Sequence, residues 1–273
     1  RPAGEWPAQF FYYAGGVPAV MEEIKSMLHL DVMTVTGKTL GENLEELKAG
    51  GFYDKCDGYL KKWGLKRTDV IRTFEEPIGT DGTVAILRGN LAPEGSVVKH
   101  SAVPKEMFKA VLKAKPFDCE EDAIEAVISR KIQPGDAVFI RYEGPKGSGM
   151  PEMFYTTEAI SSDPELGKTI ALITDGRFSG ASKGPAIGHV SPEAADGGPI
   201  ALVEEDDLIR IDIPERVLEI IGVKGEELPK EEVERILAER RKAWKPREAK
   251  YKKGVLKIYS EHAVSPMKGG YMV

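Results

Sequence analysis

The change of sequence texture near Val70 constrains the fold of this chain more than any other feature. From that point, short runs of β-branched and apolar residues are separated by Gly, Pro and Asp, which is typical of strands joined by tight turns. The 29 Gly and 18 Pro of the 273 residues follow no period, which excludes collagen. We predict strands over residues 83–87, 96–98, 137–142, 169–174, 200–203, 208–213 and 217–221.

Helical patterns flank and interrupt these strands. Apolar residues recur at helical spacing over residues 20–28 and 39–47, and the stretch between 50 and 67 is predicted to be a connector. Asp118, followed three residues later by Glu121, is predicted to cap a helix. The helices predicted after residue 100 cover 105–113, 120–130, 231–244 and 254–263. Many short strands with few helices favour a mixed α/β barrel over a doubly wound sheet.

Composition and charge exclude several classes of protein. Acidic residues outnumber basic ones by 44 to 38, so general nucleic-acid binding and attraction to an anionic membrane surface are disfavoured. No apolar run approaches the roughly 20 residues that span a bilayer. Cys56 and Cys119 lie far apart in the sequence and form no CxxC motif, so we expect two reduced structural cysteines in a cytoplasmic protein.

Two familiar nucleotide-binding motifs fail on inspection. Residues 37–39 read Gly-Lys-Thr, but the glycine that a phosphate-binding loop needs five residues earlier is replaced by Val32. Residues 147–149 begin like a dinucleotide fingerprint, but Glu152 stands where the third glycine belongs. None of the histidines has metal-ligand spacing, so each is predicted to be structural; they are His29, His100, His189 and His262.

A glycine-rich stretch over residues 173–184 follows a predicted strand and contains Ser179. Its glycines allow the backbone to approach a ligand closely. Backbone N–H groups around such a turn can stabilise an alkoxide or an oxyanion. The alternative is a tight turn in which Ser179 is a small solvated residue.

A second glycine-rich loop, over residues 141–153, ends in Glu152 between two methionines. Because Mg²⁺ uses only one or two protein carboxylates, completed by water and substrate oxygens, Glu152 is a candidate metal ligand. The alternative is an exposed loop glutamate. A third stretch, Gly188 to Ala194, either supports the site or is a plain turn.

Several collinear blocks of this sequence closely resemble the dihydroxy-acid dehydratase/6-phosphogluconate dehydratase family. The resemblance covers nearly the whole chain. The blocks are GRFSGASKGPAIGHVSPEAADGGPIAL (176–202), RYEGPKGSGMPEM (141–153), LRGNLAPEGSVVK (87–99), AGGVPAVM (14–21) and TVTGKTLGENL (34–44).

This resemblance implies a fold and a division into domains. A family member is about twice as long, and its N-terminal domain supplies three cysteines for an iron–sulfur cluster and most of the Mg²⁺ ligands. Residues 1–65 would be the tail of that α/β domain and a connector. Residues 66–273 would be a swivelling β/β/α barrel flanked by helices. The chain would then be a fragment without cluster ligands, inactive alone, whose partners are its own N-terminal domain and a second subunit in a homodimer.

The resemblance also implies the chemistry, that of a hydro-lyase. Family members remove water from 2,3-dihydroxy carboxylic acids, and the enol product becomes a 2-keto acid. Ser179 would be the base, acting as an alkoxide, and Glu152 a Mg²⁺ ligand. The residues expected to support these loops are Gly149, Gly176, Arg177 and Gly180.

The substrate stays open between two classes. The branched-chain type, which acts on 2,3-dihydroxy-isovalerate and its homologue in valine and isoleucine biosynthesis, is favoured over a sugar-acid (aldonate) dehydratase. A serine hydrolase using Ser179 and His189 is a remote alternative, because the Gly-x-Ser-x-Gly pattern of a nucleophile elbow is missing. A non-enzymatic binding module is the remaining alternative.

Overall fold

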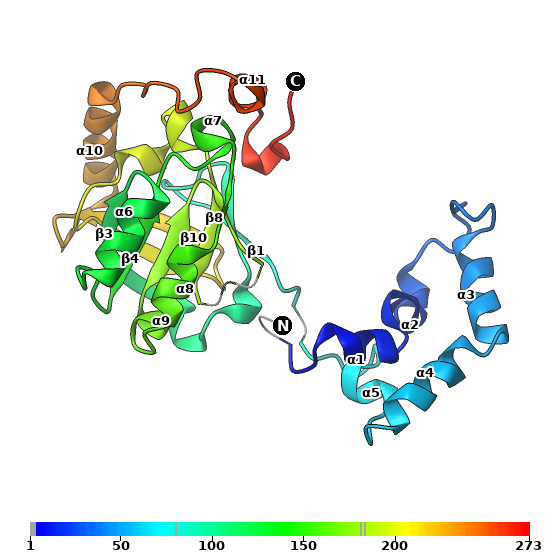
Figure 1. Ribbon diagram of the computed structural model, residues 1–273. Coiled ribbons are helices and arrows are strands. Elements are labelled where there is room, and N and C mark those ends of the chain that lie inside the picture. Colours follow the sequence, from blue (N-terminus) through cyan, green and yellow to red (C-terminus); the bar gives the residue numbers. More distant parts are fainter. Residues whose placement is uncertain (1–3, 80, 181, 183) are drawn as a thin grey trace. The chain divides into compact units, whose positions relative to one another are not determined.

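The computed structural model describes residues 4–79, 81–180, 182 and 184–273, and divides into two compact units, one ending at Gly82 and the other spanning Thr83–Val273. The first unit is helical (Figure 1). Its elements are α1 (Ala8–Tyr13), α2 (Gly16–Glu23), η1 (Lys25–Met27), α3 (Leu40–Ala49), α4 (Phe52–Lys61) and α5 (Arg67–Val70). The predicted domain ranges, 1–65 and 66–273, concern a longer protein and stay a prediction.

The helices of the first unit begin and pack for local reasons. At the start of α3, Thr39 and Glu42 form a capping box in which each side chain accepts a hydrogen bond from the other residue's backbone N–H. Leu60 on α4 is fully buried with Ala14 and Ala19 in the unit's small core. The helix α4 occupies the stretch that was predicted to be a connector, so that prediction was wrong. The buried residues of this helix, Cys56 and Leu60, lie four positions apart, which is helical spacing. The charged residues and glycines around them made this pattern hard to recognise in the sequence.

The second unit is built on a nine-stranded mixed sheet in the order β1-β2-β8-β6-β4-β3-β9-β10-β11. The central strands β3, β4, β6 and β8 run parallel, and the strands outside them pair antiparallel. Their bounds are β1 Ala85–Leu87, β2 Gly95–Val98, β3 Lys109–Phe117, β4 Asp136–Ile140, β6 Ala171–Thr174, β8 Ala186–Ser191, β9 Leu208–Asp212, β10 Val217–Val223 and β11 Glu226–Glu227. A separate pair consists of β5 (Glu152–Met153) and β7 (Arg177–Phe178).

The sheet curls so that its two ends meet. Arg88, directly after β1, forms a bridge with Val217 of β10, and the amide of Asn90 exchanges two hydrogen bonds with the backbone of Ile220. A Cβ on Gly89 would lie 2.2 Å from the carbonyl oxygen of Leu218, so only glycine permits this approach. The predicted mixed α/β class is therefore confirmed as a curled mixed sheet flanked by helices.

Alternating side chains of the central strands pack into two apolar layers. Phe139 faces a core that includes Val233 and Leu237 of α10 (Lys230–Ala243), whereas Val138 and Ile140 face the opposite layer. Helices α6 and α8 contribute to that second layer, and Figure 1 shows them with α9 against the sheet. The remaining elements are α6 Glu120–Ile128, α7 Pro145–Ser148, α8 Tyr155–Ser161, α9 Leu166–Thr169, α11 Val255–His262, η2 His100–Ala102, η3 Lys105–Met107, η4 Ala194–Asp196, η5 Pro199–Leu202 and η6 Pro266–Lys268.

Three further local predictions were wrong. The helix predicted over 105–113 is a 3₁₀ turn followed by β3, because the β-strand pairing of residues 109–117 with β4 and β9 outweighs their helical spacing. The strand predicted over 200–203 is the 3₁₀ helix η5, which Pro199 starts. Asp118 does not cap α6, because its carboxylate binds Arg141 and Arg247.

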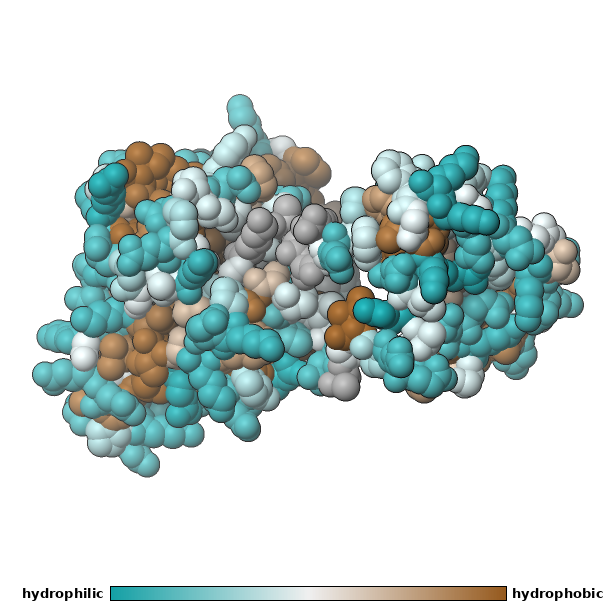
Figure 2. All heavy atoms as spheres, turned by 90° about the horizontal axis from the view of Figure 1, so that it is seen from below, coloured by the Kyte–Doolittle hydropathy of each residue, from teal (hydrophilic) through white to brown (hydrophobic). Residues whose placement is uncertain are grey.

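The surface is predominantly hydrophilic on the face shown in Figure 2, where apolar side chains form separate patches. Within the described part of the chain, no helix is long and apolar enough to cross a membrane. Cys56 and Cys119 are both free thiols.

Candidate active site

The candidate site forms where the loops that follow three parallel strands meet. Strands β4, β6 and β8 are neighbours and run in the same direction, so their carboxyl ends lie at one edge of the sheet. Ligand sites of α/β sheets form preferentially at this edge. The two glycine-rich stretches of the sequence leave β4 and β6 at this edge.

The pair β5–β7 joins the two stretches directly. Glu152 pairs with Arg177 and Met153 with Phe178 in parallel register. The backbone N–H of Ser179 then donates to the carbonyl oxygen of Met153 at 3.0 Å. The predicted metal ligand and the predicted base are therefore brought to one place, although 27 positions separate Glu152 and Ser179 in the sequence.

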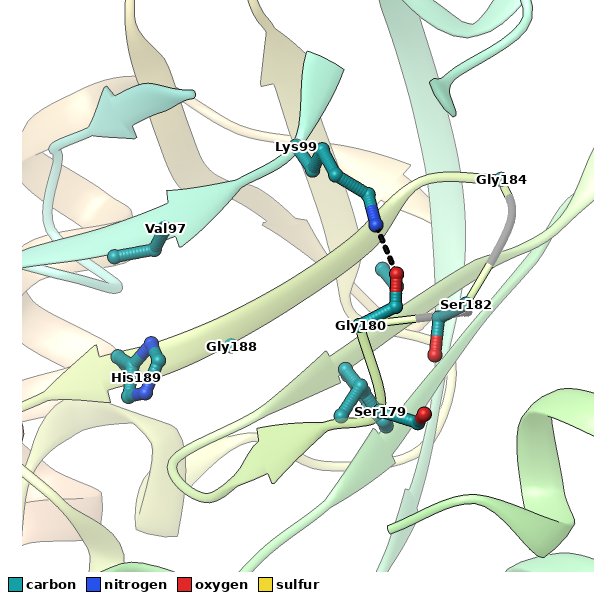
Figure 3. Close-up of a pocket in the computed structure, with 10 residues that line it drawn as sticks. Val97, Lys99, Ser179, Gly180, Ser182, Gly184, Gly188 and His189 are labelled. Carbon is teal, nitrogen blue, oxygen red and sulfur yellow. Dashed lines mark hydrogen bonds between the residues drawn. The ribbon is translucent and has the colours of Figure 1, made fainter. Parts of the chain in front are cut away.

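Ser179 lines a cavity of about 190 Å³, which we call the Ser179 cavity (Figure 3). Its walls come from β2, β8 and the turn after β7, and Val97, Phe178 and Ala186 supply apolar surface. Lys99 and His189 supply the ionisable groups among its lining residues. This volume is below the 300–1,000 Å³ typical of drug-sized ligand sites, so it suits a small metabolite.

The four predicted support residues hold the two loops in different ways. Gly149 ends α7 with a φ of +75°, and a Cβ on it would lie 3.0 Å from Leu256 Cδ2. A Cβ on Gly176 would lie 2.5 Å from the carbonyl oxygen of Glu143. The Nε of Arg177 donates to the carbonyl oxygen of Met150 at 3.0 Å.

Gly180, the fourth support residue, is exposed and has open space around it. Its carbonyl oxygen accepts a hydrogen bond from the Lys99 ammonium group (Figure 3). Residues 181 and 183 of the same stretch lie outside the described residues.

Among the described residues, the ionisable groups that line the Ser179 cavity are cationic or neutral. Burial lowers the pKa of Lys99, and no carboxylate of the described residues forms an ion pair with it. Burial, assisted by the nearby Arg177 cation, lowers the pKa of His189, which favours its neutral imidazole. The cavity therefore offers a positive potential to an anionic ligand.

A second group of residues, which we call the carboxylate cluster, consists of Glu143, Asp175 and Glu193. All three are buried, with exposed fractions of 3%, 0% and 1%. Asp175 accepts hydrogen bonds from the backbone N–H groups of Tyr142, Glu143 and Ala194 at 2.8–3.1 Å. It therefore ties together the segments that follow β4, β6 and β8.

The other two members fasten the short helix α7. Glu193 accepts hydrogen bonds from the backbone N–H groups of Lys146 and Gly147 at 3.0–3.1 Å. Glu143 accepts from the Ser148 hydroxyl and lies 3.6 Å from the Lys250 ammonium group. Burial raises the pKa of Asp175 to about 6 and that of Glu193 to about 7.

Asp175, Glu143 and Glu193 lie within the stretches singled out in the sequence, but no role was predicted for them. Asp175 directly follows four buried strand residues, and a carboxylate at that position has to be buried with partners. That signal was present in the sequence. The three backbone donors, in contrast, come from loops whose approach only the structure reveals.

Two family models match the sequence. The model described as dihydroxy-acid/6-phosphogluconate dehydratase C-terminal matches residues 69–270, and the corresponding N-terminal model matches residues 1–43. The chain belongs to this dehydratase family. The resemblance stated from the sequence blocks is thereby confirmed.

Curated relatives agree with the family models. Proteins named dihydroxy-acid dehydratase from Caldanaerobacter subterraneus, Acetivibrio thermocellus and Agathobacter rectalis are 46%, 47% and 49% identical to this chain over 271, 274 and 274 residues. The matches cover 98–99% of this chain but only 44–45% of those relatives. The chain thus spans less than half the length of the curated relatives that it matches.

Proposed function

We propose that this chain is the C-terminal part of a dehydratase that converts 2,3-dihydroxy carboxylic acids to 2-keto acids, foremost the branched-chain substrates of valine and isoleucine biosynthesis. The observation that carries the proposal is the β5–β7 pairing, which sets the segment of Glu152 beside the segment of Ser179, a residue that lines a small cavity. Family membership and the names of the relatives supply the reaction class.

Ser179 is proposed as the base that removes the C2 proton. A serine hydroxyl is too weak a base at pH 7, so it acts as an alkoxide stabilised by nearby positive charge. Lys99 lines the same cavity and binds the carbonyl of Gly180, the next residue, which places an ammonium group close to the turn. The backbone bond from Ser179 to Met153 holds this turn against β5.

Glu152 fits the role of a single protein ligand for Mg²⁺. Its side chain is exposed on β5 and forms no ion pair within the described part of the chain. No group of three or more potential ligands that could hold a metal occurs among the described residues, so further ligands would come from water, substrate and the rest of the longer protein. When bound, Mg²⁺ would act as a Lewis acid toward the substrate's carboxylate and C2 oxygen, and the iron–sulfur cluster would act as a Lewis acid toward the C3 hydroxyl.

The rest of the longer protein completes the proposal. Cys56 is buried in the first unit and Cys119 follows β3 in the second, so we assign the cluster ligands to the N-terminal domain rather than to this chain. We further propose that the curled sheet is a swivelling β/β/α barrel, and that the enzyme is a cytoplasmic homodimer. The chain alone is expected to be inactive.

The lining of the cavity favours a branched-chain substrate over a sugar acid. Val97, Phe178 and Ala186 present apolar surface that suits alkyl groups on C3. The hydroxyl groups of a sugar acid would lose water against these side chains without gaining hydrogen bonds from them.

The test is a dehydration assay on the full-length enzyme, purified without oxygen and supplied with Mg²⁺. We expect 2-keto acid from 2,3-dihydroxy-isovalerate and little from a panel of aldonic acids. In Glu152→Gln, the Mg²⁺ concentration for half-maximal rate is expected to rise at least tenfold, whereas the exposed Glu158→Gln serves as the matched control. Turnover of aldonic acids alone would assign the enzyme to the sugar-acid class, and no keto acid from any dihydroxy acid would overturn the proposal.

A further inference from the structure

We propose that His189 is a general acid–base catalyst of the Ser179 cavity that protonates C3 when the enol product becomes a keto acid. The proposal rests on the dehydration described above. His189 lies in β8, outside the two loops that carry Glu152 and Ser179.

The backbone turns His189 away from the regular alternation of its strand. Gly95 of β2 pairs with Ser191, and Val97 pairs with Gly188, so two steps along β2 correspond to three along β8. The extra residue in β8 is a β-bulge. Within it His189 has a φ of +57°, a left-handed conformation that is costly for a residue with a side chain.

A hydrogen bond fixes this strained backbone beside the site. The backbone N–H of His189 donates to the carbonyl oxygen of Gly176 at 2.8 Å. A Cβ on the preceding Gly188 would lie 3.3 Å from that same oxygen. Bulges next to active sites commonly redirect a side chain, and here the redirected side chain lines the Ser179 cavity (Figure 3).

The ring is kept available for proton transfer. No hydrogen bond or ion pair joins either ring nitrogen to another of the described residues. Burial and, after it, the Arg177 cation on β7 lower the pKa of His189 and favour its neutral imidazole, and Lys99 at the end of β2 is a second cation among the described residues that line the cavity. A neutral imidazole accepts a proton at one nitrogen and donates one from the other.

The proton balance of the reaction indicates which step His189 catalyses, the conversion of the enol to the keto acid. The C2 proton and the C3 hydroxyl leave together as water, and the product is an enol. Its conversion to the keto acid breaks the enol O–H bond and forms a C3–H bond. His189 accepts the enol proton, becomes imidazolium, and returns one proton to C3, so no net proton is gained or lost.

The closing experiment uses the full-length enzyme and a 2,3-dihydroxy acid whose C3 carries one methyl and one ethyl group. C3 of its keto acid is a stereocentre, so the face of protonation is recorded in the product. We expect the wild type in D₂O to give one enantiomer of the keto acid. We expect His189→Gln to be slower by about 10²- to 10⁴-fold and to give both enantiomers, because enol released to solvent is deuterated from either face.

The control is His262→Gln, which changes an exposed histidine and should match the wild type. A wild-type rate and a single enantiomer from His189→Gln would overturn the proposal, as would both enantiomers from the wild type itself. Should the glutamine variant not fold, His189→Ala with added imidazole decides: recovery of the reaction that gives a single enantiomer supports the role, and a folded variant that imidazole does not rescue refutes it. Failure of the wild type to form any keto acid would instead contradict the proposed dehydratase function.

Discussion

The carboxylate cluster and the Ser179 cavity both include residues of the segment between β6 and β8 but differ in how their polar groups are paired. In the cluster, every carboxylate is buried and accepts at least one hydrogen bond or ion pair. In the cavity, Lys99 has only a carbonyl partner, and the ring of His189 has none among the described residues. The comparison indicates that the cluster fixes the loops and that the cavity presents the ionisable groups of Lys99 and His189 to a ligand. Changes in the cluster should therefore cost stability, and changes in the cavity should cost function.

The largest loss of stability is expected from Asp175→Ala. The change leaves three backbone N–H groups without their acceptor, so the free energy of unfolding should fall by roughly 4 kcal/mol or more. Urea unfolding of the chain followed by circular dichroism measures this. A loss below about 1 kcal/mol would show that the cluster does not hold the loops.

The ionisation of Glu193 should make stability fall as pH rises. Its pKa of about 7 in the folded chain exceeds the ordinary 4.5, so the folded state keeps a proton that the unfolded chain loses. The contribution is complete below pH 4.5 and lost by pH 7, and amounts to roughly 3 kcal/mol. Asp175, with a pKa of about 6, acts in the same direction, whereas the lowered pKa of His189 acts against it.

The difference between the wild type and Glu193→Gln isolates this effect. The difference between the urea midpoints at pH 5 and pH 8 should be smaller in the variant than in the wild type, because Asp175 still contributes in both proteins. Asp196 and Lys146, the other charged groups near Glu193, are unchanged in both proteins. Equal pH dependence in both would assign the effect to other groups.

Two glycines of the same turn should respond differently to alanine. A Cβ on Gly176 would lie 2.5 Å from the Glu143 carbonyl oxygen, whereas a Cβ on Gly180 meets nothing within 4 Å. Gly176→Ala should lower the free energy of unfolding by about 1–3 kcal/mol. Gly180→Ala should leave it within about 0.5 kcal/mol of the wild-type value. Similar losses from both would contradict the close packing of the cluster.

The smallest effect on stability is expected from Lys99→Met. This change removes one exposed hydrogen bond, from the Lys99 ammonium group to the carbonyl oxygen of Gly180, so the urea midpoint should hardly move. In the full-length enzyme, the KM for an anionic substrate should rise about tenfold, because the cavity loses the positive charge that attracts the substrate. No carboxylate of the described residues pairs with Lys99, so the change leaves no unpaired negative charge behind. Lys99→Arg should retain most of the affinity, and an unchanged KM in Lys99→Met would rule out the electrostatic role.

The sequence predicted those features that depend on local pattern or on the family blocks. The strands over 137–142 and 208–213 were predicted because their apolar runs are bounded by turn residues, and β4 and β9 occupy these ranges. β3 was missed, because a strand that pairs on both edges is decided by its neighbours rather than by its own periodicity.

The candidate site divides in the same way. Ser179 and Glu152 could be chosen from glycine-rich loops and the family resemblance, and their roles stay predictions. The β5–β7 pairing and the bulge at His189 depend on contacts between distant segments, so the sequence alone did not reveal them. His189 was predicted to be structural because it lacks metal-ligand spacing; the structure shows that its ring lines the cavity, and its catalytic role is a proposal.

The most direct test of the account is the turnover of 2,3-dihydroxy-isovalerate by full-length Ser179→Ala enzyme, measured beside the wild type under anaerobic conditions with Mg²⁺. Loss of the proposed base should lower kcat by about 10³-fold or more, while the free energy of unfolding stays within about 0.5 kcal/mol of the wild type. Wild-type turnover by Ser179→Ala would contradict the account, because the cavity would then not hold the base.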